Sequence, residues 1–319
     1  MVAIAIADSE YERLEAILTN QITPAVPLKA RFRALFTLKS VKSDRAVDII
    51  AKAFTDPSAL LRHELAYVLG QMKNEHAIPV LNNVLANLKE DSMVRHEAAE
   101  ALGAIGKESS IETLTKYLDP STELSREVRE TAELAIERIR YEISLTNPVD
   151  NTSGYESIDP APALETKTVS EGSKVKTLSA PEVGAILMDT QLPLFMRYKA
   201  MFALRNRGDT ESVLELAKGF EDESALFRHE IAYVFGQMQH KASVPSLIKT
   251  LSNETEQPMV RHEAAEALGS IATPECIEVL EKFKADNADV VKESCVVGLD
   301  MADFEISGDF QYAERVETI

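Results

Sequence analysis

The sequence predicts an all-α protein, an α-solenoid of eight helix pairs in two pseudo-symmetric halves that a long linker joins. Apolar residues recur at helical spacing in short segments separated by turns, as at Leu81, Val84, Leu85 and Leu88. The segments also repeat, because a unit of 31–34 residues with two helices recurs along the chain. Units of this length and content are typical of HEAT-like helical repeats.

The second half repeats the first at a nearly constant offset. The segment RYKAMFALRN at 197–206 matches RFRALFTLKS at 31–40, 166 residues earlier. Four helix pairs are predicted in each half, the first half covering 1–142 and the second 179–304. Residues 143–178 are rich in Pro, Ser, Thr and charge, so we expect a long, partly mobile linker. The last residues, 305–319, lack a clear period and are predicted to form a frayed tail.

Composition restricts the class of function. The 319 residues carry a formal net charge of −18, which argues against a nucleic-acid ligand, because a duplex requires a basic surface. The charge favours a cationic partner, although it can also serve solubility alone. Two cysteines without a CxxC motif, Cys276 and Cys295, indicate a reducing compartment, and we expect a cytoplasmic location. With no signal-like or bilayer-length apolar segment, no membrane association is expected.

One dipeptide, His-Glu, occurs four times in similar surroundings. Two copies lie 33 residues apart in each half, and the halves are offset by 166 residues. The pairs are His63-Glu64 in RHELAYVLGQM, His96-Glu97 in MVRHEAAEALGAI, His229-Glu230 in RHEIAYVFGQM and His262-Glu263 in MVRHEAAEALGSI. Only the two middle repeats of each half carry the pair, whereas the outer repeats have a ring or a carboxylate there. A residue needed only to pack duplicated repeats should recur in all of them, so we interpret the pairs as functional.

Histidines at one position of successive stacked helices project from the same side of the array. Neighbouring helices pack about 8–10 Å apart, so two imidazoles can meet at an ion between them. Two imidazoles and one carboxylate with open positions are typical of non-haem Fe(II) sites that use O₂. From the spacing alone, a dinuclear metallohydrolase and a non-catalytic scaffold stapled by metal remain alternatives.

Other repeated residues give weaker signals. Four of them lie one helical turn after a motif histidine: Tyr67, Tyr233, Glu100 and Glu266. Contact with a metal ligand stays open for all four, with core packing favoured for the tyrosines and solvent exposure for the glutamates. Glycines follow each histidine by seven positions, at Gly70, Gly103, Gly236 and Gly269. They permit close helix approach or end the helix, and helix ending is the simpler expectation. The repeated arginines are expected to hydrogen-bond along the stack.

The four motifs closely resemble those of the deoxyhypusine hydroxylase family. RFRALF at 31–36, PLFMRYKAMFALR at 193–205 and SIDPAPAL at 157–164 share this resemblance, which extends from about Phe32 to Asp300. It implies a HEAT-repeat monooxygenase with two irons and O₂ as co-substrate. It also implies that the substrate is the deoxyhypusine side chain of eukaryotic translation initiation factor 5A, which becomes hypusine. An external electron donor is required, and we expect a monomer.

The resemblance also assigns roles to the motif residues. One iron is expected on His63, His96 and Glu97, and the other on His229, His262 and Glu263. Glu64 and Glu230 match positions that hold substrate rather than metal. Deoxyhypusine carries amines that are protonated near neutral pH, so carboxylates beside the metals can pair with them.

Overall fold

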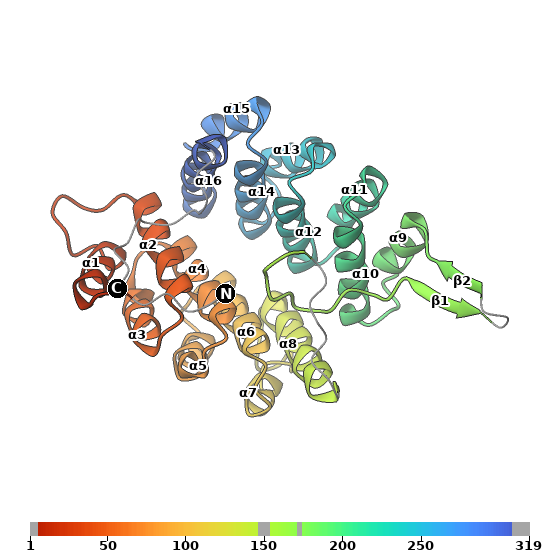
Figure 1. Ribbon diagram of the computed structural model, residues 1–319, viewed down its shortest axis with the longest axis horizontal. Coiled ribbons are helices and arrows are strands. Elements are labelled where there is room, and N and C mark those ends of the chain that lie inside the picture. Colours follow the sequence, from red (N-terminus) through yellow and green to blue (C-terminus); the bar gives the residue numbers. More distant parts are fainter. Residues whose placement is uncertain (1–5, 146–153, 171–173, 308–319) are drawn as a thin grey trace. The chain divides into compact units, whose positions relative to one another are not determined.

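The computed structural model describes residues 6–145, 154–170 and 174–307. The chain divides into two compact units, unit 1 comprising Met1–Leu145 and Asp303–Ile319, and unit 2 comprising Thr146–Ala302. Helices dominate both units (Figure 1), which confirms the prediction of an all-α solenoid of helix pairs. Within the described ranges a single two-stranded sheet is added to the helices, and no helix is long and apolar enough to cross a bilayer.

Unit 1 contains four successive helix pairs. They are α1 (Asp8–Leu18) with α2 (Leu28–Val41), α3 (Asp44–Lys52) with α4 (Ala59–Met72), α5 (Ile78–Ala86) with α6 (Ser92–Ile105), and α7 (Ser110–Thr115) with α8 (Arg126–Ser144). The second helices of successive pairs contact one another in the order α2, α4, α6, α8. Their apolar side chains, such as Leu65 of α4 and Leu102 of α6, form the fully buried core of the unit.

Unit 2 follows the same plan. Its pairs are α9 (Ala180–Met188) with α10 (Leu194–Arg207), α11 (Thr210–Ala217) with α12 (Ala225–Met238), α13 (Val244–Ser252) with α14 (Pro258–Ile271), and α15 (Pro274–Phe283) with α16 (Asp289–Ser307), of which the residues up to Ala302 belong to this unit. Helix α16 continues through residues 305–307, which the sequence placed in a frayed tail. The tail prediction is wrong for these three residues, because no Gly or Pro lies between residue 304 and Gly308. The remaining tail, 308–319, lies outside the described residues.

The four helices that carry His-Glu pairs share one register. Each has its N-cap residue five positions before the histidine, at Ser58, Asp91, Ser224 and Gln257. Three of these caps accept a hydrogen bond from a backbone N–H of the first turn, and the fourth helix instead begins with Pro258. The starts of the helices therefore put every motif histidine at the same position of its helix.

The segment predicted as a linker is partly built into unit 2. Strand β1 (Lys167–Ser170) pairs with β2 (Lys174–Thr177) in an antiparallel hairpin. Before it, Asp159 accepts two hydrogen bonds, of 2.7 and 2.6 Å, from Arg205 of α10. Tyr155 lies over the same guanidinium, 4.4 Å from it. The side chain of Arg205 is fully buried, and a buried charge requires such partners. Residues 154–164 therefore pack on α10 instead of forming a free linker.

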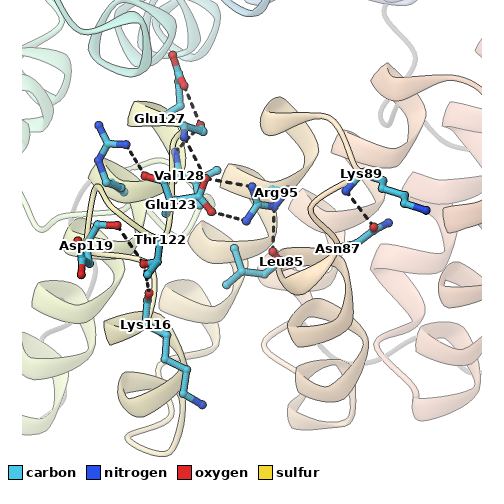
Figure 2. Close-up of polar contacts among 12 residues, drawn as sticks. Leu85, Asn87, Lys89, Arg95, Lys116, Asp119, Thr122, Glu123, Glu127 and Val128 are labelled. Atoms are coloured by element: carbon cyan, nitrogen blue, oxygen red, sulfur yellow. Dashed lines mark hydrogen bonds and ion pairs between the residues drawn. The ribbon is translucent and has the colours of Figure 1, made fainter.

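Buried arginines join successive helix pairs (Figure 2). Arg95 of α6 donates from Nε to the carbonyl oxygen of Leu85, 2.9 Å away at the end of α5. Its two Nη atoms donate to the carboxylate of Glu123, in the turn that precedes α8. We call this arrangement an arginine clasp. The other clasps are Arg31 with Leu18 and Asp56, Arg197 with Leu187 and Asp222, and Arg261 with Leu251 and Asp286. The expectation that the arginines bond along the stack is confirmed.

The clasp carboxylate also organises its own turn. Glu123 accepts a hydrogen bond of 3.0 Å from the N–H of Ser125, and its carbonyl oxygen accepts one of 2.6 Å from Arg129. Burial raises the pKa of the Glu123 carboxyl, but the bonds from Arg95 and Ser125 outweigh this effect, so its pKa is lowered from the ordinary value. The charged form of Glu123 is therefore the one that the fold stabilises.

Replacing Glu123 by Gln is expected to lower the free energy of unfolding at neutral pH by about 2–3 kcal/mol, since it leaves Arg95 buried without its anion. Because the folded-state pKa is lowered, the contribution of Glu123 is complete above the ordinary pKa of 4.5. It is lost as the pH falls through the lowered pKa. Urea unfolding of both proteins, measured from neutral pH into acid, should show the difference shrinking.

Glu221→Gln is the matched control. Glu221 pairs with Lys249 at 3.3 Å, but both side chains are exposed. We expect this substitution to cost less than about 0.5 kcal/mol at any pH. An equally small effect of Glu123→Gln would contradict a stabilising role for the clasp.

Candidate metal centre

The His-Glu pairs of unit 1 meet across two neighbouring helices. His63 lies in the second turn of α4, and His96 lies at the same position of α6. Their ring centroids are 5.5 Å apart, and the ring planes are inclined by 51°. Nε2 of His63 lies 3.3 Å from Oε2 of Glu97. We call His63, His96 and Glu97 the unit 1 group.

Unit 2 repeats this geometry on α12 and α14. The rings of His229 and His262 lie 5.3 Å apart at 44°, and Nε2 of His229 lies 3.4 Å from Oε2 of Glu263. One donor atom from each of these residues falls within 4.8 Å of the others, a spacing that suits a single metal ion. We call His229, His262 and Glu263 the unit 2 group. All six residues of the two groups are buried.

Glycine explains how the imidazoles come so close. Gly70 lies two turns after His63 and within α4, against Ala101 of α6. A Cβ on Gly70 would stand only 2.7 Å from the Cα of Ala101. The glycines seven positions after the other histidines also face the next helix: Gly103 against Ala135, Gly236 against Ala267, and Gly269 against Gly298. The expectation that these glycines end their helices is wrong, because each lies inside its helix and faces the next one.

The neighbouring residues differ in their surroundings. Glu100 and Glu266 are half-buried, so the expectation of exposed helix carboxylates is wrong. A donor atom of Glu100 lies within 4.8 Å of donor atoms of His96 and Glu97. Tyr67 is also half-buried, with Nζ of Lys39 5.1 Å from its ring centroid. Tyr233, at the matching position of unit 2, is half-buried too.

Glu64 and Glu230 are buried beside the motif histidines. Each follows a histidine directly and therefore projects about 100° further around the helix axis. Neither carboxylate belongs to the compact donor clusters found within either unit among the described residues. The arrangement thus separates the glutamates of α4 and α12 from those of α6 and α14.

The donor set fits a divalent transition metal. Imidazole nitrogen and carboxylate oxygen are its usual protein ligands, and two imidazoles with one carboxylate leave coordination positions open for reactants. In unit 2 the three donor atoms lie within 4.8 Å of one another. In unit 1 the same residue types come together, with Nε2 of His63 3.3 Å from Oε2 of Glu97 and the two imidazole rings 5.5 Å apart. The chain is therefore suited to hold two ions.

Comparisons with known proteins agree with this chemistry. A family model described as HEAT repeats matches residues 50–137 and 213–300. The deoxyhypusine hydroxylase of Candida albicans is 51% identical, covering 97% of this chain and 98% of its own length. That of Xenopus laevis is 52% identical, covering 98% and 97%. The chain belongs to the deoxyhypusine hydroxylase family.

A solved structure extends this finding to the fold. Human deoxyhypusine hydroxylase, in complex with glycerol, superposes on 93% of this chain and 98% of its own, with a TM-score of 0.83 and 45% identity. As a deoxyhypusine hydroxylase family member, the chain is a monooxygenase that acts on a deoxyhypusine-containing protein substrate.

The sequence did not predict two features of this structure. One is Ser294 of α16, whose Oγ lies 3.5 Å from Nδ1 of His262. No sequence signal pointed to it, since serine in a helix is common. The other is the set of carboxylates in the arginine clasps. These carboxylates follow their arginines by 25 or 28 residues, so a carboxylate recurring at this spacing after each arginine could have revealed them.

Gly70→Ala tests the close approach of α4 and α6. Alanine gains about 0.5–1 kcal/mol of helix propensity, but its Cβ would force two backbones apart, at a cost of about 1–3 kcal/mol. We expect a net loss of unfolding free energy of about 1–2 kcal/mol, measured by urea unfolding. At Gly236 the corresponding contact with the Cα of Ala267 is 3.2 Å, so Gly236→Ala should be nearly neutral. A Gly70→Ala protein as stable as the wild type would contradict this account.

Proposed function

We propose that this chain hydroxylates the deoxyhypusine side chain of eukaryotic translation initiation factor 5A. The supporting observation is the pair of buried His-His-Glu groups, one in each unit, in a chain 51% identical to a deoxyhypusine hydroxylase over 97% of its length. A metallohydrolase and a metal-stapled scaffold are not favoured, because the relatives carry the name of a hydroxylase.

The proposal assigns one iron ion to each group. His63, His96 and Glu97 hold the first ion, and His229, His262 and Glu263 hold the second. The bound iron supplies the activation of O₂ that insertion into a C–H bond requires. One oxygen atom enters the substrate. The other is reduced to water with two electrons from an external donor. Burial of the ligands keeps bulk water away from the reacting atoms.

Glu64 and Glu230 are proposed to bind the amines of the substrate. A buried carboxylate favours a cationic partner, and the deoxyhypusine amines are protonated near neutral pH. Each glutamate sits next to a metal-binding histidine in the chain, so an amine held there keeps the reacting carbon close to the metal. This division of labour leaves Glu97 and Glu263 to the metal.

We extend the proposal to a cytoplasmic monomer. Cys276 and Cys295 are buried free thiols, as suits a protein of a reducing compartment. Burial also raises the pKa of Cys295 to about 12, which keeps this thiol protonated and unreactive.

The reaction itself is tested by mass. Iron-loaded protein, the deoxyhypusine form of the factor, O₂ and a chemical reductant should add one oxygen atom to the factor. His63→Ala and His229→Ala should each lose about half of the bound iron and nearly all activity, because each removes a ligand of one group. Iron content by elemental analysis and product mass by mass spectrometry measure both effects. Full iron retention by both variants would rule out the ligand assignment.

Glu64→Gln tests the division between the glutamates. The variant keeps the size of the side chain and removes its charge, so iron content should be unchanged. Loss of a charge-assisted hydrogen bond of about 1.5–3 kcal/mol should raise the substrate KM by roughly 10–150-fold. Glu230→Gln should behave alike.

Glu97→Gln is the matched control, and it should lose iron. The division is wrong if Glu64→Gln loses iron as Glu97→Gln does.

A further inference from the structure

The surroundings of the second histidine differ between the two groups. In unit 2, Oγ of Ser294 donates a hydrogen bond of 3.0 Å to Oε1 of Glu266. Both oxygens flank Nδ1 of His262, which lies 3.5 Å from Ser294 Oγ and 3.7 Å from Glu266 Oε1. Ser294 and His262 are fully buried, and they come from neighbouring helices, α16 and α14.

Unit 1 has a hydroxyl at the equivalent place but uses it differently. In the fourth repeat the two halves are offset by 163 residues, as the clasp partners Glu123 and Asp286 show. Ser294 therefore corresponds to Thr131 of α8. Oγ1 of Thr131 donates to the carbonyl oxygen of Glu127, one turn earlier in its own helix, at 2.8 Å.

The hydrogen bond from Ser294 to Glu266 determines what the serine can offer to His262. A hydroxyl carries one proton, and Ser294 gives it to Glu266. Towards His262 the serine then offers only lone pairs, as does an ionised carboxylate. Acceptors beside Nδ1 select the imidazole tautomer that is protonated at Nδ1. The lone pair of Nε2 is then available for a metal ion, and the ring orientation is fixed.

A purely structural role would predict another geometry. Serine and threonine inside helices commonly return their hydrogen bond to the carbonyl oxygen four residues earlier, as Thr131 does. Ser294 instead bonds across helices to a carboxylate 28 residues earlier in the chain.

We infer that Ser294 and Glu266 are positioning residues for His262, and that metal binding by the unit 2 group depends on them. Metal binding by the unit 1 group does not depend on Thr131. The inference deepens the proposed function and rests on it in one respect, that His262 holds a metal ion.

The test isolates one group at a time in the full-length chain. His63→Ala disables the unit 1 group and His229→Ala disables the unit 2 group. Metal-free protein is titrated with Co(II), whose visible absorption reports binding and ligand geometry. In the His63→Ala background, Ser294→Ala should weaken Co(II) binding by about 10–100-fold and alter the spectrum. In the His229→Ala background, Ser294→Ala should change neither the affinity for Co(II) nor the spectrum.

Thr131→Ala in the His229→Ala background is the matched control, with no change expected. Glu266→Gln in the His63→Ala background is the second variant, and it should weaken binding in the same range. Glu266 is half-buried, which makes this change mild for folding, and circular dichroism of the metal-free proteins checks the fold.

The outcomes separate the inference from the proposed function. A wild-type chain that binds no Co(II) overturns the metal centre of the proposed function. Binding by the wild type together with unchanged affinity of Ser294→Ala and Glu266→Gln overturns only the positioning role. An equal loss in Thr131→Ala also overturns it, because removal of any buried hydroxyl would then have the same effect.

Discussion

The pairing of buried arginines constrains the rest of this structure. A guanidinium inside a helical stack is tolerated only when its hydrogen bonds and its charge are satisfied. Arg95 meets this need by reaching back to Leu85 and forward to Glu123, so one side chain of α6 holds the end of α5 and the turn that precedes α8. His96 is the next residue in the chain and lies about 100° around the helix. The rotation that satisfies the arginine therefore also directs the imidazole toward its neighbours.

Rotation alone does not bring two imidazoles together, because the helices must also be close. Gly70 provides this second constraint, two turns along α4 from His63, where any side chain would collide with Ala101. Arginine and glycine thus act on different coordinates, one on the angle of each helix and the other on the distance between helices. Both residue types recur at the matching positions of unit 2, where the imidazoles have nearly the same separation, 5.3 Å against 5.5 Å.

Local and repeated features were predictable from the sequence, and unrepeated long-range contacts were not. Periodic apolar residues and the repeat length define the helix pairs, and the confinement of His-Glu pairs to the middle repeats singled out the candidate site. The role of Gly70 was misjudged, since glycine ends many helices and only tertiary packing separates the two uses. The contact between Asp159 and Arg205 joins residues 46 apart and has no counterpart among the described residues of the other half, so no repeated pattern predicted it.

The two units carry groups of the same three residue types, yet the residues around these groups differ. Ser294 and Thr131 occupy equivalent positions and differ by one methyl group. A β-branched threonine has fewer side-chain rotamers open to it in a helix than serine has, and Thr131 uses one in which its hydroxyl bonds Glu127 in the preceding turn. Serine lacks this restriction, and the hydroxyl of Ser294 reaches Glu266 instead. Two equivalent positions that differ by one methyl group therefore place the hydroxyl differently, on its own helix at Thr131 and beside the histidine of the neighbouring helix at Ser294.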